Sequence, residues 1–276
     1  MNMMDYTKFV CSIFIRNKWI YDDSDDEESR DKMIRLGEGL SDEEREMMIT
    51  LLSKYKKIPL NDYTNQLLEL TNLLKPVDYA NIKDFYVLPI KRPEDFLKTK
   101  SSDNIAYIFC NTPKIKKHVF FQNKKINLIS YKSIPETINT STKKGLILID
   151  DFSGSGNTAM ECLNYLCQEC SISKEKIIVM FMCSMKKSFY ELKNKNFNVY
   201  ANYIQEKGIS DITDDSMRKT YIELMNNLET RFNFKEHDKF GFDKTESLIT
   251  FIRTPNNTFP VFWDGKRNKN APFERI

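Results

Sequence analysis

Apolar positions in the first part of the chain recur every three or four residues, which is the spacing of amphipathic helices. The segment SDEEREMMITLLSKYKK begins with Ser41 and has Glu44 three positions later, which is the pattern of a capping box at a helix start. Acidic residues crowd its first turn, where the helix dipole favours them. Its apolar positions form one face made of Met47, Met48, Leu51, Leu52 and Tyr55.

A second helix is predicted to begin after Asn61 or Asp62 and to end before Pro76. Between these helices and the N-terminus lies an acidic run, Asp22 to Glu28, for which we expect a solvated loop. Residues 1–78 are therefore expected to form a helical N-terminal lobe. The buried face of the second helix is expected to contain Leu67, Leu70, Leu73 and Leu74.

From about Ile82 onward, short apolar runs replace the helical periodicity. Several of these runs are apolar at successive positions, which suits strands that are covered on both faces of a sheet, and their spacing leaves room for crossover helices. Residues 79–276 are therefore predicted to be an α/β domain with a mostly parallel sheet. The expected strands are FYVLPI (85–90), IAYIFC (105–110), INLIS (126–130), GLILID (145–150), KIIVMFMC (176–183), FNVYANY (197–203), SLITFIR (247–253) and FPVFW (259–263).

Composition narrows the class of protein only slightly. The chain has 276 residues, and its 42 Lys and Arg against 39 Asp and Glu give a net charge of +3, which argues neither for nor against a nucleic-acid partner. No apolar run approaches the roughly 20 residues that span a bilayer. Most of the six cysteines lie in apolar segments, where free thiols pack as small hydrophobes, so a cytoplasmic protein without a membrane partner is expected.

The most informative stretch is LILIDDFSGSGNT, residues 146–158. LILID reads as a buried strand and NTAMECLNYLCQEC as the helix after it, so the turn between them lies at the carboxyl end of a strand, where open α/β sheets bind ligands. The small residues of the turn let backbone N–H groups approach an anion such as a phosphate monoester. Cys162, Cys167 and Cys170 follow in this helix with a spacing that favours buried thiols over a metal site.

Two acids beside an anion site would repel the anion unless the same ligand also carries hydroxyl donors or a divalent metal. A ribose 5-phosphate has both parts, because its phosphate suits the turn and its 2- and 3-hydroxyls suit Asp150 and Asp151. Three other motifs fail at specific positions. A Rossmann fingerprint lacks its third glycine, and a Walker A loop lacks the lysine after Gly156. A nucleophile elbow needs glycines two positions before and after its serine, where Ser155 has Ser153 and Asn157.

Residues 146–158 resemble the phosphoribosyltransferase signature over its whole length: apolar residues, two acids, and a small turn that ends in threonine. The resemblance implies a type I phosphoribosyltransferase core that binds 5-phosphoribosyl 1-diphosphate with Mg²⁺. It gives Asp150 and Asp151 the catalytic role of holding the ribose hydroxyls and the metal. It gives the 5-phosphate to the turn, made of Ser153, Gly154, Ser155, Gly156, Asn157 and Thr158.

One position departs from the purine-salvage members of that class. An acid often stands there at the position of Gly154 and exchanges a proton with the base, which a glycine does not do. The resemblance therefore identifies the donor and leaves the acceptor open.

Three segments in order, 85–109, 148–159 and 254–265, behind a helical N-terminus, resemble phosphoribosyltransferase-like proteins of bacterial conflict and anti-phage loci, including some retron systems. This similarity implies an effector role in defence with a partner protein of the same system. Resemblance to the broader transferase class implies a homodimer.

Two further segments have a ligand-binding and a structural interpretation each. KRPEDFLKTKSSDN joins two expected strands, and its Lys100, Ser101 and Ser102 either hold the diphosphate or lie in a solvated loop. TPNNTFPVFW either walls an acceptor pocket, with Phe259 or Trp263 stacking on a base, or serves turns and the core. For the whole chain, two hypotheses remain: a phosphoribosyltransferase, and a ligand-sensing module without activity that uses the same sugar-phosphate site.

Overall fold

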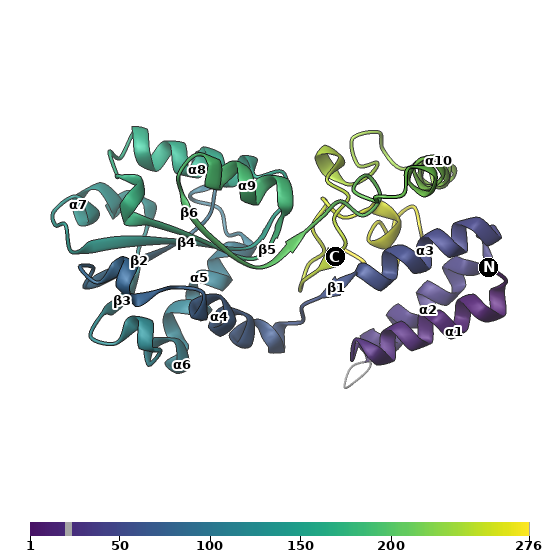
Figure 1. The fold of residues 1–276 in the computed structure, drawn as a ribbon, viewed down its shortest axis with the longest axis horizontal. Coiled ribbons are helices and arrows are strands. Elements are labelled where there is room, and N and C mark those ends of the chain that lie inside the picture. The colour runs from purple at the N-terminus through teal and green to yellow at the C-terminus, as the bar shows by residue number, and fades with distance from the viewer. Residues whose placement is uncertain (20–23, 276) are drawn as a thin grey trace. The chain divides into compact units, whose positions relative to one another are not determined.

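The computed structural model describes residues 1–19 and 24–275 (Figure 1). Its contacts divide the chain into two compact units: unit 1 combines residues 1–60 with 206–276, and unit 2 is the continuous segment 61–205. The division into a helical lobe (1–78) and an α/β domain (79–276) stays a prediction. It gave no indication that the two ends of the chain share one unit.

Unit 1 is mainly helical. The capping box at the start of its third helix is confirmed, because the Glu44 N–H donates to Ser41 Oγ and the Ser41 N–H donates to the Glu44 carboxylate. Two very short parallel strands pair Lys56 with Ile249. The elements of unit 1 are α1 (Met3–Arg16), α2 (Ser24–Glu38), α3 (Asp42–Lys54), β1 (Lys56–Lys57), α10 (Asp215–Arg231) and β7 (Ile249–Thr250).

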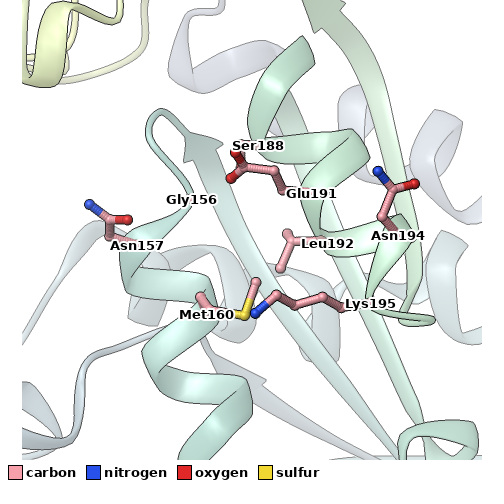
Figure 2. A pocket seen from close by; sticks show the side chains of 8 residues that line it. All are labelled: Gly156, Asn157, Met160, Ser188, Glu191, Leu192, Asn194 and Lys195. Atoms are coloured by element: carbon pink, nitrogen blue, oxygen red, sulfur yellow. The ribbon is translucent and has the colours of Figure 1, made fainter.

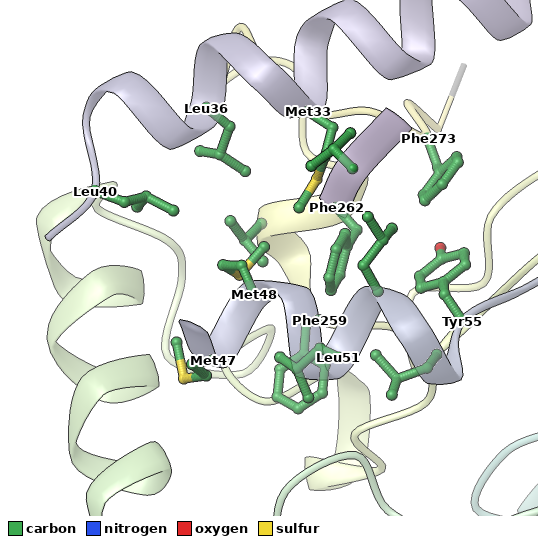
Figure 3. Packing of buried hydrophobic residues seen from close by; sticks show 14 of the residues in the cluster. Met33, Leu36, Leu40, Met47, Met48, Leu51, Tyr55, Phe259, Phe262 and Phe273 are labelled. Carbon is green, nitrogen blue, oxygen red and sulfur yellow. The ribbon is translucent and has the colours of Figure 1, made fainter. Parts of the chain in front are cut away.

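One apolar core holds the two parts of unit 1 together (Figure 3). Phe273 stacks on Tyr55 with ring centroids 4.4 Å apart, and it also stacks on Phe14 at 6.4 Å. The predicted apolar face of α3 is confirmed, because all five of its members are buried in this core. Burying such aromatic rings contributes much of the stability of a small core.

Unit 2 is an α/β unit built on a five-stranded parallel sheet with strand order β3-β2-β4-β5-β6. This confirms the predicted fold class, an α/β core with a mostly parallel sheet that follows an N-terminal helical region. The elements of unit 2 are α4 (Tyr63–Asn72), β2 (Asp84–Pro89), α5 (Ser101–Asn111), α6 (Pro113–Lys116), β3 (Lys125–Leu128), α7 (Ile134–Ile138), β4 (Lys144–Ser153), α8 (Asn157–Gln168), β5 (Ile177–Met185), α9 (Lys186–Asn194) and β6 (Asn198–Gln205).

Helices cover both faces of this sheet. Helices α7, α8 and α9 lie on one face and α4, α5 and α6 on the other (Figure 1). Residues of β4 from Gly145 to Ile149 and all of β5 are buried, as expected for strands that are apolar at successive positions. The sheet therefore gives the turn after β4 a rigid support.

Three of the predicted strands were wrong in whole or in part. IAYIFC is part of helix α5, because Ile105, Ala106 and Phe109 are buried at helical spacing while Tyr107 is exposed. Of SLITFIR, only β7 is a strand, and it pairs with β1 outside the large sheet. FPVFW contains a 3₁₀ turn, Pro260–Phe262, which begins with a proline whose fixed φ suits a helical start.

Two smaller expectations also need correction. Leu73 lies beyond the end of α4 and is 43% exposed, so it is not part of the buried face. The acidic run is not one solvated loop, because residues 24–28 begin helix α2, whereas residues 22 and 23 lie outside the described residues. Among the described residues, the structure contains no helix with the length and apolar character needed to cross a bilayer.

Candidate functional site

The predicted acids lie where the topology of the sheet favours a ligand site. Along the chain, β2 is followed by β3 on one side of it in the sheet and then by β4 on the other, so the strand order reverses between β2 and β4. In open α/β sheets, ligands bind outside the carboxyl ends of the strands at this kind of switch point. The carboxyl end of β4 carries Asp150 and Asp151, and the segment after β2 begins with Ile90 and Lys91.

The two carboxyl groups of the pair affect each other. The Asp151 N–H donates to Asp150 Oδ1 at 2.9 Å, and both residues are only half-buried. Desolvation and the neighbouring Asp151 charge raise the pKa of Asp150 well above its ordinary value, and a further contribution comes from Asp103. Desolvation also raises the pKa of Asp151. The pair is therefore electrostatically unfavourable when both groups are ionised. A bound cation or hydroxyl donor would stabilise the ionised form.

The turn after the acids holds a helix start open to a ligand. Gly156 is the N-cap of the twelve-residue helix α8 and has a φ of +83°, a left-handed conformation that favours glycine. Its N-cap, a glycine, makes no side-chain cap hydrogen bond, and the N-terminus of a helix favours an anion. Gly154, Ser155 and Thr158 are half-buried and Asn157 is exposed, which places them along the rim of the turn.

Ser153 has a different role from its neighbours in the turn. It is buried, and its hydroxyl lies 2.7 Å from the hydroxyl of Ser188, which is also fully buried in the first turn of α9. A Cβ atom at Gly156 would lie 2.6 Å from Ser188 Oγ. Ser188 therefore holds the turn from behind. Ser188 was not predicted from the sequence, because it lies beyond the next strand and belongs to no local motif.

The three residues predicted in the segment after β2 have separate positions. Ser101 Oγ lies 3.4 Å from Asp151 Oδ1 and donates to it, so the structure brings Ser101 to the acids. Ser102 is buried and donates to the Ile90 carbonyl, which fixes the start of α5. Lys100 Nζ lies 3.1 Å from Asp95 and forms an ion pair with it.

The other basic side chains of the segment after β2 also form ion pairs. Lys91 is 5% exposed and its ammonium contacts Asp103 at 2.7 Å, while Arg92 lies 3.5 Å from Glu161 and Lys98 lies 2.6 Å from Asp95. A buried lysine paired with an acid behind the site is a feature that sequence spacing did not reveal.

The metal prediction rests on Asp150 and Asp151 alone. In the part of the chain that the structure describes, no group of three or more metal-binding side chains comes together. Two carboxylates nevertheless suit Mg²⁺, which usually takes one or two carboxylates and completes its shell with waters and substrate phosphates. Asp150 and Asp151 would hold it.

A hollow of about 400 Å³ lies between α8 and α9, next to the turn (Figure 2). Of the predicted residues, only Gly156 and Asn157 line it; Met160, Ser188, Glu191, Leu192, Asn194 and Lys195 complete the lining. The hollow therefore borders the turn but not the acids.

The other candidate segments serve the structure. Phe259 is fully buried in the core of unit 1, and the Trp263 indole N–H donates to the Thr258 carbonyl at 2.7 Å. These contacts favour the core interpretation of TPNNTFPVFW. Cys162 and Cys170 are buried and Cys167 is half-buried, with Cys170 beyond the end of α8.

Comparison with known proteins gives a match over most of the chain. A family model described as PRTase-CE matches residues 38–275. No curated protein matches the chain. Among solved structures, the chain is similar to a hypothetical protein from Neisseria gonorrhoeae with bound ppGpp, and the match covers 61% of this chain and 97% of that one at 12% sequence identity and a TM-score of 0.32.

Proposed function

The chain belongs to the PRTase-CE family of phosphoribosyltransferase-like proteins, and we propose that its residues 150–158 bind the ribose and 5-phosphate of 5-phosphoribosyl 1-diphosphate or a related nucleotide. The observation that carries the proposal is the direct succession of an acid pair and an open helix N-terminus at the switch point of the sheet. The acids suit the hydroxyls of a ribose, and the helix start suits its phosphate.

As a transferase, the protein would fix the donor while the bond between ribose C1 and the diphosphate oxygen breaks. The electron pair leaves with the diphosphate, a nucleophile forms the new bond to C1, and the nucleophile loses its proton. Asp150 and Asp151 would accept hydrogen bonds from the 2- and 3-hydroxyls, and the backbone N–H groups from Gly156 to Thr158 would hold the 5-phosphate in place. When bound at the acids, Mg²⁺ would neutralise charge on the diphosphate.

A second candidate function is ligand sensing without turnover. A leaving diphosphate needs cations, yet each basic side chain of the segment after β2, Lys91, Arg92, Lys98 and Lys100, contacts an acid. Gly154 also supplies no acid or base to an acceptor. Both observations favour a site that binds a ribose phosphate and holds it.

One set of measurements tests whether the site binds a ribose phosphate and whether it acts as a transferase or as a sensor. Binding of 5-phosphoribosyl 1-diphosphate with Mg²⁺ is measured by calorimetry, and release of diphosphate is followed alone and with nucleotides or cell extract. Asp150→Asn with Asp151→Asn is expected to lose binding at least tenfold. Glu191→Gln, an acid of α9 that lines the hollow but not the acid site, is the matched control and should bind as the natural protein does.

The outcomes separate the hypotheses. Turnover that the double variant abolishes supports the transferase, and tight binding without turnover under every condition supports the sensor. If neither ribose phosphates nor nucleotides bind, both are wrong.

The proposed biological role is that of an effector in bacterial anti-phage defence, acting with a partner protein of the same system. It rests on the resemblance of the segments 85–109, 148–159 and 254–265 to proteins of such loci. Plaque formation is compared on bacteria that express the locus with the natural chain and with the Asp150→Asn and Asp151→Asn variant. Equal plaque counts with both, at equal protein levels, would overturn this role for the site.

A further inference from the structure

Lysines begin or directly precede the strands of the five-stranded sheet at its amino edge, by which we mean the end of the sheet where β2 to β6 start. Lys83 precedes β2, Lys125 begins β3 and Lys143 precedes β4, and all three are exposed. The backbone places them side by side, because the Lys83 N–H donates to the Lys143 carbonyl and the Lys125 N–H donates to the Lys83 carbonyl, both at 2.8 Å. They form a row across three neighbouring strands.

The row continues across the other two strands. Lys176 precedes β5 and reaches back to the Ser141 carbonyl at 3.1 Å, next to the start of β4. Lys174 donates to the carbonyl of Lys195 at 2.9 Å, and the exposed Lys195 lies just before β6. Adjacent strands are about 4.8 Å apart, so the four gaps between five strands make a row of about 19 Å.

Little negative charge opposes this row. Within the described ranges, none of Lys83, Lys125, Lys143 and Lys195 has a carboxylate within ion-pair distance. The neighbouring Lys124 donates to the carbonyls of Tyr79 and Ile82, both at 2.7 Å, and so adds its charge without an acid.

Two further observations describe the charge at this edge. Partial burial lowers the pKa of Lys124, and the nearby charge of Lys83 lowers it further. The acids that begin or precede these strands are Asp84, which is half-buried, and Glu175, which is exposed. The amino edge is therefore a positive strip.

The neutral residues of the strip point to the kind of anion. Polar neutral residues stand beside the lysines before β3, β4 and β6: Gln122 and Asn123, then Ser141 and Thr142, then Asn194 at the end of α9 and Asn196, whereas Phe197 before β6 is buried. Lysines with amide and hydroxyl donors are the side chains that contact nucleic-acid phosphates. A membrane surface would instead call for apolar side chains that insert between lipids.

We propose that the amino edge of the sheet binds the phosphate backbone of a nucleic acid, without reading its sequence. A row of about 19 Å is long enough to contact several phosphates of a nucleic-acid backbone. The contacts are made to phosphates and not to base edges, and binding therefore falls steeply with salt.

This surface is separate from the proposed donor site. Asp150 and Lys143 lie toward opposite ends of β4, whose ten residues span about 33 Å at 3.3 Å per residue. A nucleic acid held at the amino edge therefore does not occupy the site at the carboxyl edge, and the two kinds of binding can be lost independently.

The test uses the full chain and a fluorescent 20-base-pair DNA duplex, with the corresponding single strand in parallel, in anisotropy titrations at several salt concentrations. The variant Lys83→Glu, Lys125→Glu, Lys143→Glu is expected to bind at least tenfold more weakly. Because each lost phosphate contact lowers the slope of log K against log salt by about 0.9, its slope should be smaller by two to three. The matched control, Lys8→Glu, Lys54→Glu, Lys219→Glu, makes the same change of charge at exposed positions of unit 1.

Circular dichroism and binding of 5-phosphoribosyl 1-diphosphate verify that both variants are folded. Equal loss of DNA binding in the two triple variants would overturn the proposal, because the effect would then come from total charge. Three further results would also overturn it: no binding of either nucleic acid by the natural protein at low salt, stronger binding to vesicles that contain phosphatidylserine, or a dimer of the chain that only the amino-edge variant loses.

Discussion

The hydroxyls of Ser153 and Ser188 share a buried hydrogen bond of 2.7 Å that ties the end of β4 to the first turn of α9. This contact joins two positions that are far apart in sequence, and it stands directly behind the turn that we propose to hold a phosphate. The shape of the turn thus depends on a helix that the phosphoribosyltransferase signature does not include.

Removing one partner of this bond should destabilise unit 2. Ser188→Ala leaves the buried Ser153 hydroxyl without its partner, which costs about 1–3 kcal/mol of unfolding free energy. The double variant with Ser153→Ala should lose less than the sum of the two single variants, with a coupling of about 1 kcal/mol. Hydrogen exchange of the slowest amides in β4 and β5 measures these values.

An exposed pair of serines provides the control for that cycle. The Ser130 and Ser133 hydroxyls lie 3.1 Å apart at the surface, where water replaces a lost partner, so the same cycle should give a coupling near zero. Equal coupling at the two pairs would contradict the role assigned to burial.

Gly156→Ala should destabilise unit 2 and weaken the turn. A residue with a Cβ atom pays about 1–2 kcal/mol in the left-handed region, and here that atom would also meet Ser188 Oγ at 2.6 Å. Gly154→Ala in the same turn is the matched control, because its φ is not positive. Hydrogen exchange is again the measurement, and equal losses in the two variants would show that backbone conformation at Gly156 is not the cause.

The acid pair predicts how the stability of the protein without ligand depends on pH. The folded state keeps a proton on the pair above the ordinary aspartate pKa of 3.8, whereas the unfolded chain has lost it, so the free energy of unfolding falls as the pH rises above about 4. Asp150→Asn should reduce this fall and stabilise unit 2 at pH 8 by on the order of 1 kcal/mol. The measurement is hydrogen exchange at pH 5 to 8, corrected for intrinsic exchange rates, with the exposed Glu191→Gln as control. A variant profile parallel to that of the natural protein would contradict the prediction.

Glu229 gives unit 1 a pH dependence of its own. Its carboxylate is fully buried and accepts from the Phe240 N–H at 3.0 Å, and desolvation raises its pKa from 4.5 to about 8. Between these values the folded state holds a proton that the unfolded chain has lost, so stability falls with rising pH by up to about 1.4 kcal/mol per pH unit and levels off above pH 8.

Glu229→Gln is neutral in both states and should remove that fall. Both tryptophans of the chain, Trp19 and Trp263, lie in unit 1, so urea unfolding followed by tryptophan fluorescence at pH 5, 6.5 and 8 reports on this unit. The exposed Glu223→Gln on the same helix is the control. A slope that survives in the Glu229→Gln variant would place its cause elsewhere.

Local signals in the sequence were enough to locate the candidate site. Strand β4, the turn with Gly156 and helix α8 follow from apolar runs and glycine spacing, and the capping box at Ser41 follows from two residues. Features that depend on distant segments could not be found in this way. The ion pair of the buried Lys91 with the half-buried Asp103 is one example, since it forms only when the segment after β2 turns back on itself.

Helix α5 illustrates a different limit. Its segment IAYIFC is apolar enough for a strand, and only the burial of Ile105 and Phe109 on one side shows the helical period. Short apolar runs are ambiguous in this way because they satisfy both patterns.

The contacts of Phe273 affect the order in which the two units can fold during synthesis. Because this ring packs against Tyr55 and Phe14, the core of unit 1 closes only after residue 273 has been made, whereas unit 2 is complete once residue 205 has emerged. During synthesis the sheet, with the turn after β4, can therefore fold first. The apolar faces of helices α1 to α3 stay exposed until the C-terminal residues that cover them have been made. Truncation shortly before Phe273 would leave a folded sheet attached to a helical unit with an incomplete core, whose exposed apolar surface favours aggregation.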